Sequence, residues 1–145
     1  MEIGTRAWAP LYEGFRRAFG EELFLLLVPD VSTVKGEQIR RHCTEHPDWV
    51  LVCEVQGQPA AFLTYYLRPE LGCGEIGNNA VAPDWRHRGL AQRLYAKVFE
   101  RFRAAGLRFA KVTTNLDDGH APARRAYERA GFDISCPAIT YYRKL

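Results

Sequence analysis

Cysteine is scarce in this sequence, and its spacing is not that of a metal or redox site. The chain has 4 cysteines in 145 residues, and no two of them form a Cys-x-x-Cys pair. Zinc knuckles and thioredoxin-type sites need such closely spaced thiols. The sequence therefore predicts no metal, and we expect Cys43, Cys53, Cys73 and Cys136 to be free thiols in a reducing compartment.

Long apolar runs are also lacking. The longest, residues 23–28, is far too short to cross a bilayer, since a spanning helix takes about 20 residues. The first residues do not show the basic, apolar and small-residue regions of a signal peptide. We therefore expect a cytoplasmic protein with no membrane partner.

Neither sign of charge dominates. Lys and Arg number 20 and Asp and Glu 17, which gives a formal net charge of +3. Acidic residues stand among the arginines, as Asp84 does near Arg86 and Glu128 beside Arg129. This balance favours an anionic ligand and falls short of a nucleic-acid-binding composition. No nucleic-acid partner is expected.

Apolar periodicity divides the chain into helices and strands. Apolar residues three or four apart predict helices, and alternating runs rich in β-branched and aromatic residues predict strands. The expected helices are residues 9–28, 33–45, 89–105 and 122–131. The expected strands are residues 49–55, 59–67, 75–82, 107–114, 132–135 and 139–143.

The order of these elements indicates an α/β fold. The first two strands flank a Gln-Gly-Gln turn at residues 56–58 and should form a hairpin. Strand 75–82, helix 89–105 and strand 107–114 make a crossover unit, whose two strands should lie parallel. No repeat, low-complexity tract or charge block marks a boundary. We predict one domain over residues 1–145, with a mixed β-sheet flanked by helices.

The turn between strand 75–82 and the following helix has the composition of an anion site. It reads Pro-Asp-Trp-Arg-His-Arg-Gly-Leu-Ala over residues 83–91. The first N–H groups of a helix lack intrahelical partners, the helix dipole adds positive charge there, and Gly89 lets a ligand approach the backbone. The sequence thus predicts a phosphate-binding turn.

Two motifs resemble those of the GNAT superfamily, the Gcn5-related N-acetyltransferases. Arg86-x-x-Gly89-x-Ala91 is similar to its Arg/Gln-x-x-Gly-x-Gly/Ala signature. Residues 120–132 are similar to its Asn-x-x-Ala-x-x-x-Tyr-x-x-x-Gly-Phe pattern, with His120 in the place of the Asn. The positions that match the second pattern are Ala123, Tyr127, Gly131 and Phe132. The resemblance covers roughly residues 49–145, and the family's usual first strand is truncated or absent here.

The resemblance implies acetyl-CoA as cosubstrate and assigns residues to it. The turn would hold the pyrophosphate through Arg86, His87, Arg88, Gly89, Leu90 and Ala91. Backbone near Val81, with His120 or Asn115, would contact the pantetheine arm, and Arg124 would reach the phosphates. In the family the tyrosine matched by Tyr127 often protonates the departing thiolate.

A general base for the amine is less clearly marked. Glu75, on strand 75–82, is the first candidate, and His120 and a water relay are the alternatives. Asn78 and Asn79 are unusual inside a strand and indicate a bulge, which would reverse the facing of Glu75 relative to Val81.

The resemblance implies direct transfer of acetyl to a primary amine in a ternary complex. Composition favours a small-molecule amine, since few acidic residues mark the first helices for a polycationic acceptor. The alternatives are a protein lysine or N-terminal acetyltransferase, and a non-catalytic acyl-CoA-binding module. Family members are often dimers, so a homodimer is possible here.

Overall fold

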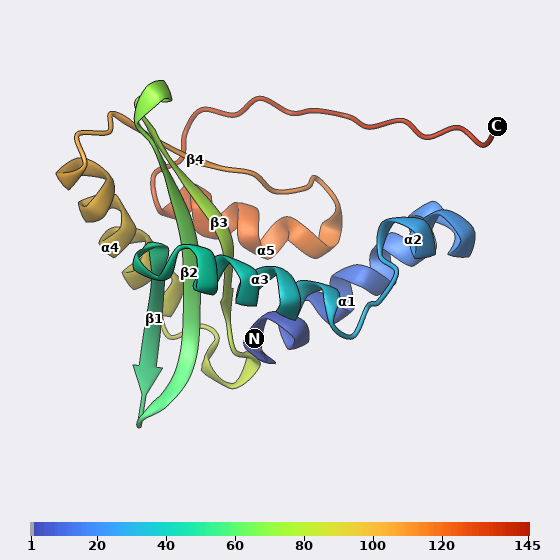
Figure 1. Cartoon of the computed structure of the whole chain (residues 1–145), viewed down its shortest axis with the longest axis horizontal. Helices are drawn as coiled ribbons and strands as arrows, with labels where there is room; N and C mark the ends of the chain where they lie inside the picture. Colours follow the sequence, from blue (N-terminus) through green and yellow to red (C-terminus); the bar gives the residue numbers. More distant parts are fainter. Residues whose placement is uncertain (1) are drawn as a thin grey trace.

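A computed structural model describes residues 2–145 and shows a sheet of four strands in the order β1-β2-β3-β4 (Figure 1). The strands are β1 (Val50–Val55), β2 (Gln58–Arg68), β3 (Cys73–Val81) and β4 (Phe109–Val112). β1, β2 and β3 pair antiparallel, and β4 lies parallel to β3. The predicted hairpin, crossover unit and mixed α/β sheet are therefore confirmed.

Helices cover both faces of this sheet (Figure 1). The helices are α1 (Glu2–Phe19), α2 (Glu21–Leu27), α3 (Val34–Glu45), α4 (Leu90–Ala104) and α5 (Ala121–Arg129). α1 and α3 pack on one face, where Phe62 points, whereas α4 packs on the other, against Leu63. α5 lies beside α4, because Gln92 Nε2 donates to the Ala126 carbonyl at 2.9 Å. We call these the α1/α3 face and the α4/α5 face.

The first helical region differs from the prediction of one helix over residues 9–28. The helix begins earlier, at Glu2, and the chain breaks at Gly20, whose φ of 76° is outside the helical range. α2 follows as a short separate helix. α1 begins at Glu2, the first residue that the structure describes, so no strand precedes it within residues 2–145.

β3 carries the predicted bulge. Leu63 pairs with Asn79 while Tyr65 pairs with Ile76, so one extra residue of β3 stands opposite Thr64. The Thr64 hydroxyl fills the gap, accepting from the Asn78 N–H at 2.8 Å and donating to the Asn78 carbonyl at 3.2 Å. As a result, Glu75 and Asn78 point to the α1/α3 face, and Asn79 points to the α4/α5 face.

The two parallel strands part just before the bulge. β4 is shorter than predicted, and its pairing with β3 ends at Ile76 and Val112. Residues 77–81 of β3 therefore have a partner strand on the β2 side only. Backbone N–H and C=O groups on that open edge are free to bind an extended ligand.

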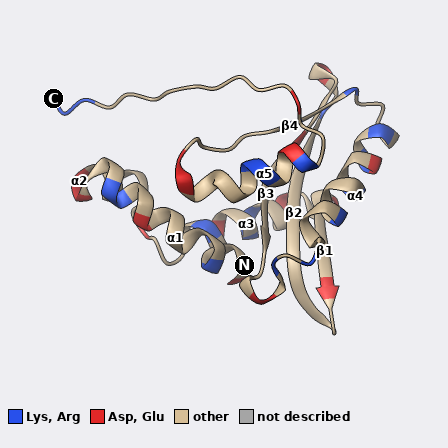
Figure 2. Cartoon of the chain, turned by 180° about the vertical axis from the view of Figure 1, so that it is seen from behind, with Lys and Arg blue, Asp and Glu red and all other residues tan. Residues whose placement is uncertain are grey.

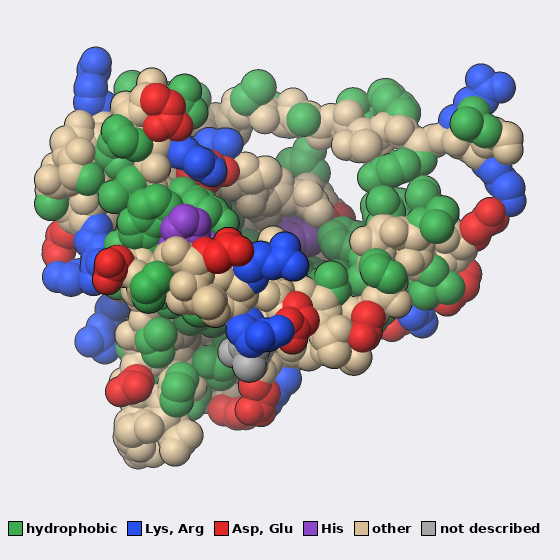
Figure 3. Space-filling model, viewed as in Figure 1, with side chains coloured by type: hydrophobic (Ala, Val, Ile, Leu, Met, Phe, Trp, Pro, Cys, Tyr) green, Lys and Arg blue, Asp and Glu red, His purple; other side chains and the backbone are tan. Residues whose placement is uncertain are grey.

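The predicted strands at residues 132–135 and 139–143 do not form. Phe132 packs against the core, and residues 133–145 run as an exposed, extended segment that reaches from α5 to α2 (Figures 1 and 3). Two contacts hold its far end: the Tyr142 ring lies tilted against the Phe19 ring, and Lys144 pairs with Glu22. Alternation of apolar residues correctly indicated extended backbone, but a strand also needs a partner, which local sequence does not specify.

Candidate active site

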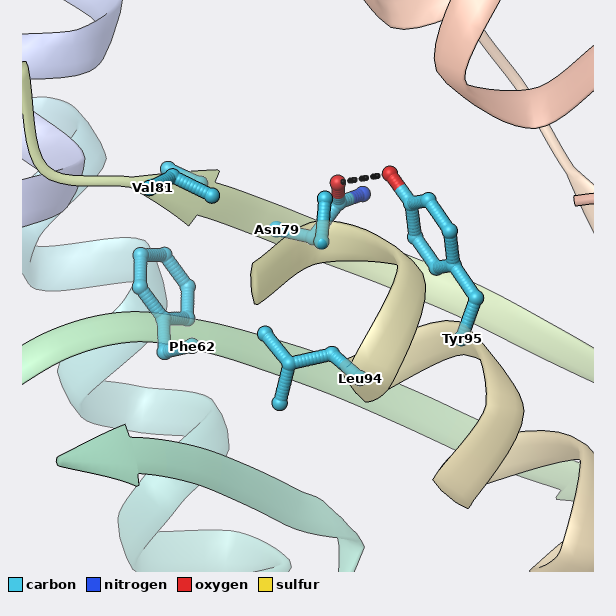
Figure 4. Close-up of a pocket in the computed structure, with 7 residues that line it drawn as sticks. Phe62, Asn79, Val81, Leu94 and Tyr95 are labelled. Atoms are coloured by element: carbon cyan, nitrogen blue, oxygen red, sulfur yellow. Dashed lines mark hydrogen bonds between the residues drawn. The ribbon is translucent and has the colours of Figure 1, made fainter. Parts of the chain in front are cut away.

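Three polar side chains meet where β3 and β4 part. The Tyr127 hydroxyl accepts a hydrogen bond from Asn79 Nδ2 at 3.0 Å, and Asn79 Oδ1 accepts one from the Tyr95 hydroxyl at 2.9 Å. Figure 4 shows the Tyr95–Asn79 bond. The two phenols come from α5 and α4, and the amide comes from the bulged strand, so three elements fix this network.

The network leaves the Tyr127 proton free. Asn79 uses its one amide oxygen for Tyr95 and gives an N–H to Tyr127, so Tyr127 is an acceptor in this bond and can donate elsewhere. Burial raises the pKa of the Tyr127 phenol above its ordinary value, and the polar partners Asn79 and Tyr95 partly oppose the rise. Burial also raises the pKa of Tyr95. Both phenols are protonated at neutral pH.

A small cavity of about 30 Å³ lies next to this network. Val81 and Asn79 of the open β3 edge line it on one side, and Ala91 and Leu94 of the first turns of α4 line it on the other (Figure 4). The structure thus brings Val81 and Ala91, two residues assigned to the cofactor, to the same place.

The turn before α4 has the geometry of an anion site. It begins with a 3-10 turn, η3 (Pro83–Trp85), and Gly89, the residue before α4, has a φ of 74°. A Cβ added to Gly89 would meet no atom within 4 Å, so the space beside the first N–H groups of α4 is open. Residues 86–89 are exposed, and His87 also has a positive φ of 60°.

One arginine of this turn is held against an aromatic ring. The Arg88 guanidinium stacks on the Trp85 ring, 4.7 Å from its centroid, which holds the side chain at the turn. Figure 2 shows Lys and Arg interspersed with Asp and Glu along the chain. At the start of α4, the helix dipole and the charges of Arg86 and Arg88 favour an anion.

His120 forms a close pair with Asp117 in the loop before α5. The loop ends in a 3-10 turn, η4 (Asp118–His120), and His120 Nδ1 lies 2.7 Å from Asp117 Oδ2. Because a carboxylate accepts, we assign the proton to Nδ1, which leaves a lone pair on Nε2. The imidazole stacks against Phe15 of α1, with ring centroids 5.9 Å apart. The pair therefore faces the α1 side of the site.

Arg124 stabilises this loop. Its Nη1 donates to the carbonyls of Asn115 and Asp117, at 2.6 and 2.8 Å. That use competes with the predicted contact of Arg124 to phosphate, which remains a prediction. The Asn115 side chain is exposed, and its predicted contact with a pantetheine arm is also untested.

Glu75 lies apart from Tyr127, on the α1/α3 face. Its two carboxylate oxygens pair with Lys111 at 3.2 Å and Arg68 at 3.7 Å. Both carboxylate oxygens are thus engaged in ion pairs. The assignment of the base to Glu75 remains a prediction, and His120 remains the alternative.

Asn79 and Tyr95 are site residues that the sequence did not reveal as such. Asn79 was singled out for the bulge, but its bonds to two phenols depend on the packing of α4 and α5. From its spacing, Tyr95 belongs to the apolar face of α4. Only the structure shows that its buried hydroxyl donates a hydrogen bond to Asn79. The Asp-x-x-His spacing of residues 117–120 was the one local signal of the His120 pair.

The model of the acetyltransferase (GNAT) family matches residues 8–132, and the chain belongs to this family. The resemblance seen in the sequence is thereby confirmed. No curated protein matches the chain significantly.

Solved structures share this fold. A protein assigned to the GNAT family from Desulfovibrio desulfuricans is 28% identical, with a TM-score of 0.67 over 79% of this chain and 75% of that one. The Escherichia coli ribosomal-protein-S18-alanine N-acetyltransferase is 21% identical, with a TM-score of 0.55 over 67% of this chain and 61% of its own.

The aminoglycoside N-acetyltransferase AAC(6')-Iy, solved with CoA, is 16% identical, with a TM-score of 0.57 over 80% of this chain and 96% of its own. The chain spans less than two thirds of some of the proteins it matches, the Escherichia coli enzyme among them. In residues 2–145 no helix is long and apolar enough to cross a membrane, and no three His, Cys, Asp or Glu side chains are grouped as metal ligands would be.

Proposed function

We propose that this protein is an acetyl-CoA-dependent N-acetyltransferase that transfers acetyl directly to a primary amine of a small molecule in a ternary complex. The observation that carries the proposal is the Tyr127–Asn79 pair, which sets a protonated, buried phenol beside the split between β3 and β4. A binding module would need the turn at residues 86–91 but no such phenol.

The residues present fit acetyl-CoA. Open space beside Gly89 and the free N–H groups of the first turn of α4, at Leu90 and Ala91, suit the pyrophosphate, with Arg86, His87 and Arg88 around it. The open edge of β3, ending at Val81, would bind the pantetheine arm through its backbone. Acetyl-CoA supplies a thioester, whose carbonyl carbon is the electrophile.

Tyr127 serves as the acid. When the amine attacks the thioester carbonyl, the C–N bond forms, the C–S bond breaks and negative charge develops on sulfur. Tyr127, which keeps its proton at neutral pH, donates it to that sulfur. Asn79 holds the phenol in place and stabilises the phenolate through its N–H. The free thiol leaves with the Tyr127 proton.

His120 serves as the base, oriented by Asp117. Its Nε2 takes one proton from the amine nitrogen, so the N–H lost by the amine and the proton gained by sulfur balance. His120 and Tyr127 are seven residues apart, which places them about 10 Å apart along α5 and on nearly the same side of it. The imidazole also lies against Phe15 of α1, where we place the amine.

Binding and kinetics test these assignments together. Calorimetry should show saturable binding of acetyl-CoA and CoA and none of ATP at the same concentrations, because the pantetheine edge and the turn act jointly. Initial rates with two varied substrates should give intersecting lines, as a ternary complex requires, and no acetylated protein should accumulate without amine. Parallel lines or a stable acyl-enzyme would contradict direct transfer.

A further inference from the structure

Lys35 of α3 lies in an unusual position for a lysine. Its side chain is partly buried. Its Nζ stands 4.6 Å from the centroid of the Trp8 ring, donates to Gln38 Oε1 at 2.6 Å and donates to Asn78 Oδ1 at 3.2 Å. The ammonium thus lies between α1 and α3, over the bulge of β3.

The charge of Lys35 has no opposite charge beside it. Among residues 2–145, no carboxylate lies within 4.0 Å of its Nζ, and its three neighbours are two amide oxygens and an indole. Burial lowers the pKa of the Lys35 ammonium, which shows that its surroundings disfavour the charge. Lys35 also lies near the N-terminus of α3, where the positive end of the helix dipole further disfavours an ammonium.

The neighbours of Lys35 connect it to the reaction site. Asn78, which it contacts, is the residue next to Asn79, and the bulge turns the two side chains to opposite faces of the sheet. Tyr127 therefore approaches the split from the α4/α5 face and Lys35 from the α1/α3 face. Lys35 keeps part of its surface exposed on the α1/α3 face, beside the bulge.

We propose that Lys35 binds a carboxylate of the acceptor, and that the acceptor class is amino acids or other small amines that carry a carboxylate. This inference rests on the proposed N-acetyltransferase function. An anion at Lys35 would supply the missing opposite charge, and the amine of the same acceptor would extend from there toward His120, along α1. A polycationic amine is disfavoured here, because it would bring more positive charge to an uncompensated ammonium.

The test compares matched acceptors in matched variants. Thiol release from acetyl-CoA is measured with the common amino acids, and with the amide and the decarboxylated amine of each one that reacts. The enzymes are wild type, Lys35→Met, Lys35→Arg and Lys97→Met. Lys97 is the control because it is an exposed lysine of α4 that pairs only with Glu100, on the same helix.

We expect wild type to prefer the carboxylate form. Lys35→Met should raise KM for the amino acid by about 10–100-fold, the range for loss of a charged hydrogen bond, and leave KM for the amide and the acetyl-CoA Kd within about twofold. Lys35→Arg should recover much of the preference, and Lys97→Met should keep it all. A lysine that only pins α1 to α3 would lower the melting temperature without changing the ratio of amino acid to amide, which would overturn the proposal.

Failures of the two proposals differ. Thiol release with amines but with no amino acid overturns the carboxylate site and leaves the transferase. If no amine releases thiol although acetyl-CoA binds, the transferase proposal fails. Binding of the same amino acids at Lys35 is then measured by the change in tryptophan fluorescence during titration. A change that Lys35→Met abolishes would support an anion site even then, and no change in wild type would overturn it.

Discussion

The Tyr127 hydroxyl and the Asn79 amide lie 3.0 Å apart, although 48 residues separate them in the sequence. The contact joins α5 to the bulge of β3, at the point where β3 leaves β4. Tyr127 is held there by packing as well, since it is 8% exposed and contacts the rings of Tyr95 and Phe132. A proton donor fixed by both a hydrogen bond and its packing is suited to one geometry of the leaving sulfur.

Tyr127→Phe should lower kcat by about 10²–10⁴-fold and change the acetyl-CoA Kd by less than about threefold, because it removes a proton donor and little volume. Steady-state thiol release and calorimetry measure the two quantities. Tyr65→Phe is the matched control, a buried tyrosine whose hydroxyl donates to the Asp48 carbonyl and accepts from Arg101 away from the split. Equal rates for wild type and Tyr127→Phe would return Tyr127 to a purely structural role.

Asn79→Leu should lower both stability and kcat, because it leaves the Tyr95 hydroxyl without its acceptor and Tyr127 without its positioning N–H. An unpaired buried polar group costs about 1–3 kcal/mol, which denaturant unfolding can measure. In the Tyr127→Phe background the same change should reduce kcat little further. Full additivity of the two losses in kcat would show that Asn79 does not act through Tyr127.

Gly89→Val should weaken acetyl-CoA binding by at least about 10-fold, since the side chain would enter the open space beside the N–H groups of α4. Gly106→Val at the other end of α4 is the control. Gly106 has a φ of 73° against 74° for Gly89, and neither Cβ would meet an atom within 4 Å, so the backbone strain is matched. Similar losses of affinity in both variants would mean that strain in α4 and not the turn explains the effect.

His120→Gln should lower kcat by about 10²–10³-fold, while Glu75→Gln should leave kcat within about threefold, because Glu75 is already paired with two cations. Rates are measured across pH with an amine that Lys35 does not restrict, and circular dichroism confirms folding. The reverse ranking, with Glu75→Gln the more damaging, would assign the base to Glu75.

Local pattern predicted most of the elements. The apolar face of α4 and the alternation in β1 and β2 are strong periodic signals, and Asn78 and Asn79 correctly indicated the bulge. The first helical region breaks at Gly20, whose positive φ cannot be predicted from the spacing of apolar residues. The strands expected after residue 131 failed for a different reason, since pairing depends on a distant partner.

Only part of the candidate site could be predicted from the sequence. Residues 86–91 and Tyr127 stand in recognisable motifs, so they could be named in advance. The roles of Asn79, Tyr95 and Lys35 arise from packing between elements far apart in the chain, such as Lys35 with Asn78, and no local spacing encodes them. Arg124 is predicted as a phosphate ligand, and the bonds from its Nη1 to two loop carbonyls are a further contact that local sequence does not show.

The central claim is that this chain catalyses acetyl transfer to an amine, and amine-dependent thiol release from acetyl-CoA tests it most directly. Wild-type protein is incubated with acetyl-CoA and an amine panel, free thiol is followed over time, and the N-acetylated product is identified by mass spectrometry. The account predicts thiol release that needs both amine and protein and that falls at least about 100-fold in Tyr127→Phe. Saturable acetyl-CoA binding with no amine-dependent release would contradict it and identify an acyl-CoA-binding module.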